Sequence, residues 1–313
     1  MVILSLVSAP RVEGQEAVQR YVDFLMRVRS GAVLVSNPAS GRIRAVWNAE
    51  VAAGRAFPPG STAKLVESAA VLEEGLLSPS ERIRCRRVPE LLGERYHCAH
   101  PPADEPYDLP AALANSCNYF FSALSTRLSP AMLAHWYSVF GFGTPMTVQG
   151  WNSDVGVLRI GTDARAKALA ALGEAGLLAT PAQVLLAYSA VAMRGEVYPL
   201  HRGVGGPNAS PSPLRRIKLS PRTFDLLTAG LEQCAQAGTC RAAAVPGVRV
   251  AGKTGTAADP GSGGHTHAWF VGYAPIDHPR IALVVLLDRG TGARDAAPLA
   301  GKILRRYFAA GSP

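Results

Sequence analysis

The chain has 313 residues, of which 48% are hydrophobic and 18% charged, and its formal net charge is +9. A chain of this length and composition buries a sizeable core, which excludes an intrinsically disordered protein. Its apolar runs are all shorter than the roughly 20 residues that a transmembrane helix needs.

Arginine carries most of the positive charge, since lysine supplies only 5 of the 32 basic residues. The basic clusters at 82–87 and 214–218 are short and lie outside any recognisable nucleic-acid-binding motif. We therefore interpret the charge as solvated surface and expect no nucleic acid partner.

Residues 1–30 are interpreted as an N-terminal segment, with a signal or anchor stub and a lead-in helix, and residues 31–313 as one domain. The stretch 2–7 is apolar but short and follows no basic region, so the sequence shows no clear export signal or membrane tether. Two strands follow at 31–35 and 42–47, and the turn residues between them predict a hairpin.

Residues 57–60 (F-P-P-G) cannot continue a helix backwards, so the sequence predicts a helix that begins at Ser61. Apolar residues then recur at helical spacing, at Leu65, Ala69, Leu72 and Leu76. Ser61 and Lys64 are three residues apart and share a face of this helix, near its N-terminal end where the dipole favours negative charge.

A serine hydroxyl becomes a useful nucleophile when a base lies within hydrogen-bond reach. Lys64 is a candidate base if burial or a neighbouring cation such as Lys253 lowers its pKa. The alternative is structural, with Ser61 as a helix cap and Lys64 as a solvated helix residue.

Two pairs of cysteines, Cys85 with Cys98 and Cys234 with Cys240, each flank a loop. Each pair predicts a disulfide in an oxidising compartment. The fifth cysteine, Cys117, is expected to pack as a small apolar residue.

A metal site is the other interpretation of the first pair. His97, Cys98 and His100, together with Cys85, are residue types that bind zinc. Their spacing matches no standard zinc pattern, so we expect no metal and no cofactor.

Ser116 and Asn118 lie in a polar turn between two apolar stretches that read as helices. Such a turn can present one hydroxyl and one amide to a cleft, where Ser116 would relay a proton and Asn118 would bind a substrate backbone. Plain helix capping is the alternative for both residues.

Alternating β-branched residues at the start of 248–257 predict a strand. This strand contains Lys253, Thr254, Gly255 and Thr256. Lys253 offers a cation and the two threonines offer hydroxyls to a carboxylate, while Gly255 allows close approach. The backbone N–H groups of Thr256 and Ser61 are candidates for an oxyanion hole.

Two further strands are predicted at 267–273 and 281–288, and a last amphipathic helix carries Leu299, Ile303, Leu304, Tyr307 and Phe308. The strands of both chain ends predict one antiparallel five-stranded sheet flanked by helices. The middle of the chain predicts an all-helical lobe, so the fold class is α+β with two lobes. The three polar motifs would meet at the seam between the lobes.

The patterns S-x-x-K, S-x-N and K-T-G each occur once, in this order. Composition alone predicts roughly 0.3, 0.4 and 0.02 occurrences, so their joint appearance is unlikely to be chance. Two of the five lysines fall in these motifs, where arginine would not serve as a base because it stays protonated.

From about Gly31 to the C-terminus the chain resembles the transpeptidase domain of penicillin-binding proteins. The resemblance rests on the three motifs and their flanks, and on two further segments: 57–64, 113–121, 250–257, 178–183 and 267–275. It implies a β-lactamase/transpeptidase-like fold and a serine acyl-enzyme formed on D-Ala-D-Ala peptides of peptidoglycan, by a DD-transpeptidase or DD-carboxypeptidase.

The resemblance also implies covalent binding of β-lactam antibiotics, a peptidoglycan stem peptide as partner, and a location outside the cytoplasm, in the periplasm or at the outer face of the cytoplasmic membrane. The sequence departs from the family in its short N-terminal segment and in residues 171–176, which replace a glycine-rich G-Q-G.

Two alternatives remain open. A β-lactamase of the common serine class needs a positioned glutamate in an E-x-x-L-N string, which this chain lacks between the second and third motifs; Glu174 is the nearest acidic residue. A slow β-lactam sensor or scaffold with the same fold is the other alternative.

Overall fold

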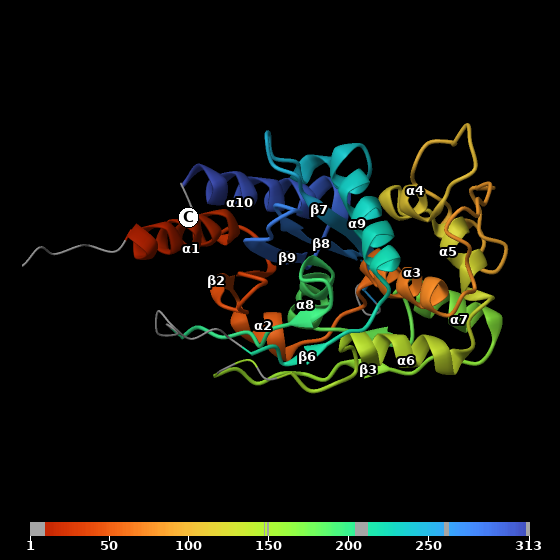
Figure 1. Ribbon diagram of the computed structural model, residues 1–313, viewed down its shortest axis with the longest axis horizontal. Helices are drawn as coiled ribbons and strands as arrows, with labels where there is room; N and C mark the ends of the chain where they lie inside the picture. The colour runs from red at the N-terminus through yellow and green to blue at the C-terminus, as the bar shows by residue number, and fades with distance from the viewer. Residues whose placement is uncertain (1–9, 147, 149, 204–211, 260–262, 311–313) are drawn as a thin grey trace, which may run out of the picture.

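A computed structural model describes residues 10–146, 148, 150–203, 212–259 and 263–310 (Figure 1). The apolar stretch 2–7, interpreted from the sequence as a signal or anchor stub, lies outside the described residues. Among the described residues, no helix has the length and apolar character needed to cross a membrane.

The central feature is a five-stranded antiparallel sheet of order β2-β1-β9-β8-β7. Two strands come from the N-terminal part and three from the C-terminal part, which confirms the predicted sheet. The bounds are β1 Gly31–Ser36, β2 Ile43–Trp47, β7 Ala251–Ala258, β8 Thr266–Ala274 and β9 Ile281–Leu287.

Strand β9 lies at the centre of the sheet and is buried throughout. Its alternate residues enter two different cores because side chains of a strand point to opposite faces. Val284 and Leu286 pack in the core shared with the helical lobe, whereas Leu283 and Val285 pack under the two terminal helices.

The terminal helices α1 (Pro10–Met26) and α10 (Ala297–Ala309) lie beside each other on one face of the sheet (Figure 1). Val22 and Met26 of α1 and Ile303 and Leu304 of α10 are fully buried against the sheet. The predicted lead-in and last helices are therefore both present, and α1 shares a core with the domain that follows it.

The opposite face is covered by a mostly helical lobe, with α8 packed directly on β9, β8 and β1. This lobe also contains two short two-stranded ladders, so it is not entirely helical as the sequence predicted. Its helices are α2 Ala49–Gly54, α3 Lys64–Glu73, α4 Leu109–Ala114, α5 Asn118–Ser125, α6 Pro130–Phe140, α7 Ala164–Ala171, α8 Pro181–Ala192 and α9 Pro221–Gln236. Its strands are β3 Val157–Leu158, β4 Leu177–Leu178, β5 Glu196–Val197 and β6 Arg215–Arg216.

Helix α8 shows how the sequence sets a helix start. The Thr180 hydroxyl accepts the Gln183 N–H and the Gln183 side chain accepts the Thr180 N–H, which forms a capping box around Pro181. The T-P-x-Q pattern therefore marks the beginning of the helix that covers the sheet.

One of the two predicted disulfides is present, between Cys234 and Cys240 at the end of α9. The other is not, since Cys85 and Cys98 are free thiols whose sulfur atoms lie 3.6 Å apart. The reason is a larger cluster, because Cys98 also contacts Cys117 and Cys85 also contacts His100.

Trp269 on β8 links the sheet to the segment that precedes Ser61, since its indole N–H donates to the Pro58 carbonyl at 3.0 Å. We predict that Trp269→Phe lowers the free energy of unfolding by about 1–3 kcal/mol, because this buried carbonyl loses its donor. Chemical denaturation measures the change. Trp47→Phe, at a half-buried indole on β2, is the matched control and should cost less. An equal loss in both variants would contradict the account.

Candidate active site

Ser61 lies on a 3₁₀ turn, Gly60–Ala63, which leads directly into α3. The sequence predicted a helix from Ser61 onward, and the structure places a tighter turn before the α-helix proper. The Thr62 hydroxyl donates to the Pro59 carbonyl at 2.8 Å and the Gly60 N–H donates to the Gly173 carbonyl at 3.0 Å. These bonds fix the turn, and Ser61 itself is partly exposed on it.

Lys64, the first residue of α3, is fully buried. Its ammonium donates to the Ser116 carbonyl at 2.9 Å, to the Ser116 hydroxyl at 3.2 Å and to Asn118 Oδ1 at 2.6 Å. The structure thus joins the first and second motifs through one amine, as the sequence predicted for a shared cleft.

Burial lowers the pKa of Lys64 to about 8, even though the nearby thiols Cys117 and Cys98 act in the opposite direction. Glu67, one turn further along α3, is also fully buried, and its burial raises its pKa well above the usual value. Glu67 favours the protonated form of Lys64, but the cost of burying the ammonium is larger, so the pKa of Lys64 stays below its usual value.

The second motif occupies the turn between α4 and α5. Ser116 adopts a left-handed conformation with φ of 54°, which non-glycine residues adopt at a cost of roughly 1–3 kcal/mol. This geometry directs both the Ser116 hydroxyl and the Asn118 amide toward Lys64. The Asn118 amide also donates to the Tyr96 carbonyl at 3.0 Å, which ties the turn to the loop 82–107.

The third motif lies on β7, as predicted. Lys253 is fully buried, and its pKa is well below the usual value because of burial and because of the positive charge of Lys64. The sequence analysis proposed that Lys253 lowers the pKa of Lys64. In the structure burial is the main cause at Lys64, and the mutual repulsion acts most on Lys253.

Gly255 allows β7 to lie against the turn that carries Ser61. A side chain at Gly255 would approach the Pro59 carbonyl to 2.9 Å and the Thr62 methyl group to 3.1 Å. A side chain at Gly60 would meet the Thr256 carbonyl at 3.0 Å. The backbones around Ser61 and Thr256 are therefore in close contact, so the predicted oxyanion-hole residues lie side by side.

The two threonines of the third motif differ. Thr254 is buried and its hydroxyl donates to the Thr239 hydroxyl at 2.6 Å. Thr256 is exposed, and its hydroxyl oxygen accepts the Gly292 N–H at 3.0 Å, which leaves its own hydrogen for a ligand. Thr256 is therefore better placed than Thr254 to bind a carboxylate.

Glu174 also borders the site, although it lies in no motif. It accepts the Ala258 N–H at 3.2 Å, at the end of β7, and burial raises its pKa. Sequence reasoning noted this residue as the nearest acid. It did not identify the Tyr96 carbonyl or Glu67, since neither carries a sequence signal.

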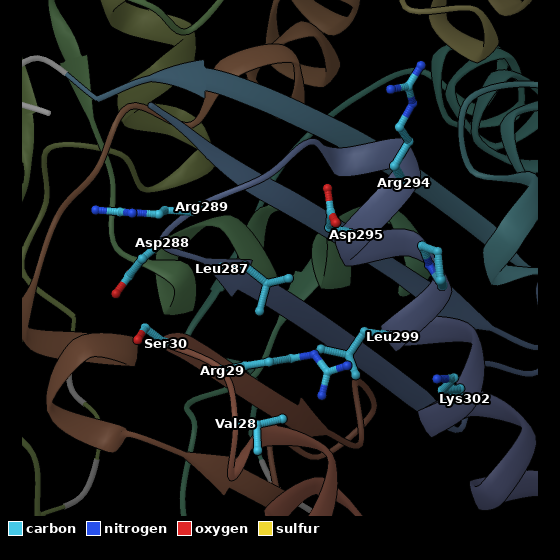
Figure 2. A pocket seen from close by; sticks show the side chains of 11 residues that line it. Val28, Arg29, Ser30, Leu287, Asp288, Arg289, Arg294, Asp295, Leu299 and Lys302 are labelled. Atoms are coloured by element: carbon cyan, nitrogen blue, oxygen red, sulfur yellow. The ribbon is translucent and has the colours of Figure 1, made fainter. Parts of the chain in front are cut away.

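A separate pocket of about 780 Å³ lies where the ends of β1 and β9 meet α10 (Figure 2). Its lining includes acids, Asp288 and Asp295, and bases such as Arg289 and Arg294. Figure 2 shows the two arginine side chains extending in different directions. A ligand site needs polar groups that converge, so this pocket supports no functional assignment.

A sequence model of the penicillin binding protein transpeptidase domain family matches residues 30–307. Peptidoglycan D,D-transpeptidase PbpA of Mycobacterium tuberculosis is 29% identical to the chain, in an alignment that covers 96% of this chain and 64% of the relative. The chain therefore spans less than two thirds of the length of this relative.

Two solved structures share the fold. The transpeptidase domain of Burkholderia pseudomallei penicillin-binding protein 3 superposes with a TM-score of 0.79 at 23% identity, covering 96% of this chain and 92% of that one. The ceftriaxone acyl-enzyme complex of penicillin-binding protein A from M. tuberculosis superposes with a TM-score of 0.78 at 24% identity, covering 94% and 78%. The predicted fold is thereby confirmed.

The contacts of Asn118 predict its contribution to stability. Asn118→Ala should lower the free energy of unfolding by about 1–3 kcal/mol, because the buried Lys64 amine and the Tyr96 carbonyl both lose a partner. Asn115→Ala, in the same turn, removes only a local bond to Ala111 and should cost about 0.5–1.5 kcal/mol. Urea denaturation of both variants checks this, and a larger loss at Asn115 would contradict it.

Proposed function

The chain belongs to the penicillin binding protein transpeptidase domain family, and on this basis we propose that it is a serine acyltransferase acting on D-Ala-D-Ala peptides of peptidoglycan. The observation that carries the proposal is the Lys64 amine, which bonds both side chains of the second motif three residues from Ser61.

In the proposed reaction, Ser61 Oγ attacks the carbonyl carbon between the two D-alanines while neutral Lys64 takes the hydroxyl proton. The N–H groups of Ser61 and Thr256 stabilise the oxyanion that forms. The C–N bond then breaks, and Ser116 passes a proton from Lys64 to the departing D-alanine amine. The product is an ester between Ser61 and the remaining peptide.

The substrate is held on both sides of the scissile bond. Asn118 binds the peptide backbone, and Lys253 with Thr256 and Thr254 holds the terminal carboxylate. Lys253 has a depressed pKa in the absence of an anion. A bound carboxylate favours its protonated form, so Lys253 becomes a cation when the substrate arrives.

The ester is resolved by an amine of a neighbouring stem peptide, which cross-links the wall, or by water, which trims it. β-Lactams acylate Ser61 in this proposal; penicillin-binding protein A from M. tuberculosis, which shares the fold, forms an acyl-enzyme complex with the β-lactam ceftriaxone. A peptidoglycan substrate places the working enzyme outside the cytoplasm, in the periplasm or at the outer face of the cytoplasmic membrane.

Hydrolysis of the acyl-enzyme is the second candidate, and it rests on Glu174. This carboxyl group lies beside the third motif, and Gly173, the residue before Glu174, packs on Gly60. A carboxylate near the acyl group can activate water, which would make the chain a β-lactamase. A slow sensor would instead keep its adduct indefinitely.

We predict that incubation with benzylpenicillin adds one drug mass to the chain, and that Ser61→Ala abolishes the adduct because the attacking hydroxyl is lost. Ser68→Ala, one helical turn past Lys64 and bonded only within the helix, is the matched control and should still be acylated. Intact-mass spectrometry over hours measures both variants.

The lifetime of that adduct separates the β-lactamase from the other two candidates. A stable adduct supports a penicillin-binding acyltransferase or a slow sensor, and rapid loss with hydrolysed drug supports a β-lactamase. An acylated Ser61→Ala protein would refute Ser61 as the nucleophile.

The rate of acylation should depend on pH through Lys64. Protonated Lys64 cannot accept the Ser61 proton, and its folded-state pKa is about 8. The rate at fixed benzylpenicillin concentration should therefore rise about tenfold per pH unit up to pH 7 and level off above about pH 8. Stopped-flow kinetics check the profile, and a flat profile from pH 6 to 8 would rule out Lys64 as the base.

A further inference from the structure

Four side chains from the segment 85–117 converge behind the second motif: Cys85, Cys98, His100 and Cys117. Their three sulfur atoms and one imidazole nitrogen all lie within 4.8 Å of one another. Cys98, His100 and Cys117 are buried and Cys85 is half-buried, and the three cysteines are free thiols. We name this group the Cys₃His cluster.

Three of the six separations between the four ligand atoms match the edges of a tetrahedral coordination shell, and the others lie within 4.8 Å. Cys85 Sγ lies 3.6 Å from Cys98 Sγ and 3.8 Å from His100 Nε2, and Cys98 Sγ lies 3.7 Å from Cys117 Sγ. Zinc bonds of about 2.3 Å to sulfur and about 2.0 Å to nitrogen give tetrahedral edges of about 3.6–3.8 Å. One ion at the centre of the cluster would therefore bind all four atoms with little movement.

A hydrogen bond to a neighbouring carbonyl orients His100 as a metal ligand. Its Nδ1 lies 2.7 Å from the Pro101 carbonyl, an acceptor, so this nitrogen carries the proton and donates it. Nε2, the nitrogen that faces Cys85, is then left with a free lone pair. A histidine ligand held through its other nitrogen by a carbonyl is the usual arrangement around protein-bound zinc.

The sulfur atoms accept backbone N–H groups, as metal-bound thiolates do. The Arg87 N–H donates to Cys85 Sγ and the Tyr119 N–H to Cys98 Sγ, both at 3.3 Å. The Phe120 N–H donates to Cys117 Sγ at 3.5 Å. The Arg87 guanidinium binds the carbonyls of Cys98 and His100, which places a positive charge beside the cluster.

We propose that the Cys₃His cluster binds one Zn²⁺ ion as a structural site. Cys₃His is an established tetrahedral zinc set, whereas calcium and magnesium require oxygen ligands. On binding, the three thiols release three protons and form Zn–S bonds, and neutral His100 supplies the fourth ligand. The metal is not redox-active, so the step needs no oxidant.

A disulfide between Cys85 and Cys98 is the competing outcome, and it was the expectation from sequence. It would use two of the four converging groups and leave Cys117 and His100 without a reason to face them. Zinc, in contrast, accounts for all four positions.

The cluster lies directly behind the catalytic turn, because Cys117 stands between Ser116 and Asn118. The loop 82–107 supplies the other three ligands, and its Tyr96 carbonyl binds the Asn118 amide. A zinc ion would fasten this loop to the left-handed turn and hold Ser116 and Asn118 against Lys64. This consequence for catalysis rests on the proposed function; the metal site itself does not.

The first test is metal content. The full chain, purified from zinc-supplemented medium without chelator, should contain one zinc per chain by mass spectrometry of the metals. Exchange for Co²⁺ should give thiolate-to-cobalt absorption in the near ultraviolet and the strong visible bands of tetrahedral cobalt. A chain without bound metal, or a Cys85–Cys98 disulfide in the metal-treated protein, would overturn the proposal.

A pair of histidine variants tests the ligand set. His97 lies three residues before His100 but is exposed and bonded to Glu94, outside the cluster. His100→Gln should weaken zinc binding by at least about 10–100-fold, because mutation of a residue that only hydrogen-bonds a zinc ligand already causes a loss of this size. His97→Gln should keep one zinc per chain. Equal zinc binding by both variants would contradict the assignment of His100 as a ligand. If His100→Gln does not fold, the cobalt spectrum of the unaltered chain tests the metal site instead.

Removal of the metal tests the link to catalysis. Chelation of the zinc-loaded chain should slow acylation by benzylpenicillin, and added Zn²⁺ should restore it. Unchanged acylation after loss of the metal would refute the positioning role. If the loaded chain binds zinc but is never acylated, the proposed function fails while the metal site stands.

Discussion

The burial of one amine governs the arrangement of the site. Lys64 is fully enclosed, and its three hydrogen-bond acceptors come from Ser116, in the turn between α4 and α5, and from Asn118, the first residue of α5. An ammonium in such a position costs free energy, which lowers its pKa toward neutrality. The same burial forces the surrounding turn into one geometry, since any displaced acceptor would leave the amine unpaired.

Other features of the molecule support this arrangement. The left-handed Ser116 directs its hydroxyl to Lys64, and Gly255 lets β7 approach the turn of Ser61 closely. Lys253 is buried beside Lys64, so the two amines cannot both hold protons without cost until an anion enters. Under the proposed function, a substrate that carries a carboxylate supplies this anion.

Much of this was predictable from the sequence, because its signals are local. Alternation predicted the strand at 248–257, a continuous apolar run predicted the strand at 281–288, and the helical spacing after Ser61 predicted α3. The spacing of Ser61, Lys64, Ser116, Asn118 and Lys253 indicated a common cleft, and the structure joins Lys64 to the second motif and places Lys253 near Lys64.

The features that could not be predicted from the sequence depend on tertiary contacts. The Cys₃His cluster uses ligands whose spacing follows no standard zinc pattern, so Cys85 and Cys98 read as a disulfide pair. The left-handed Ser116 needs the packed turn to hold it, and the Tyr96 carbonyl is a backbone group with no signal of its own. Glu67 was overlooked because a single acid on a helix is normally solvated.

The central claim is that the fold holds Lys64 as an amine of depressed pKa. With only five lysines, the chain is well suited to ¹³C-lysine labelling and titration of each side-chain signal by NMR, with Lys64→Arg and Lys253→Arg to assign the two buried residues. The account predicts a midpoint of about 8 for Lys64. A midpoint near 10.5, the ordinary value, would contradict it.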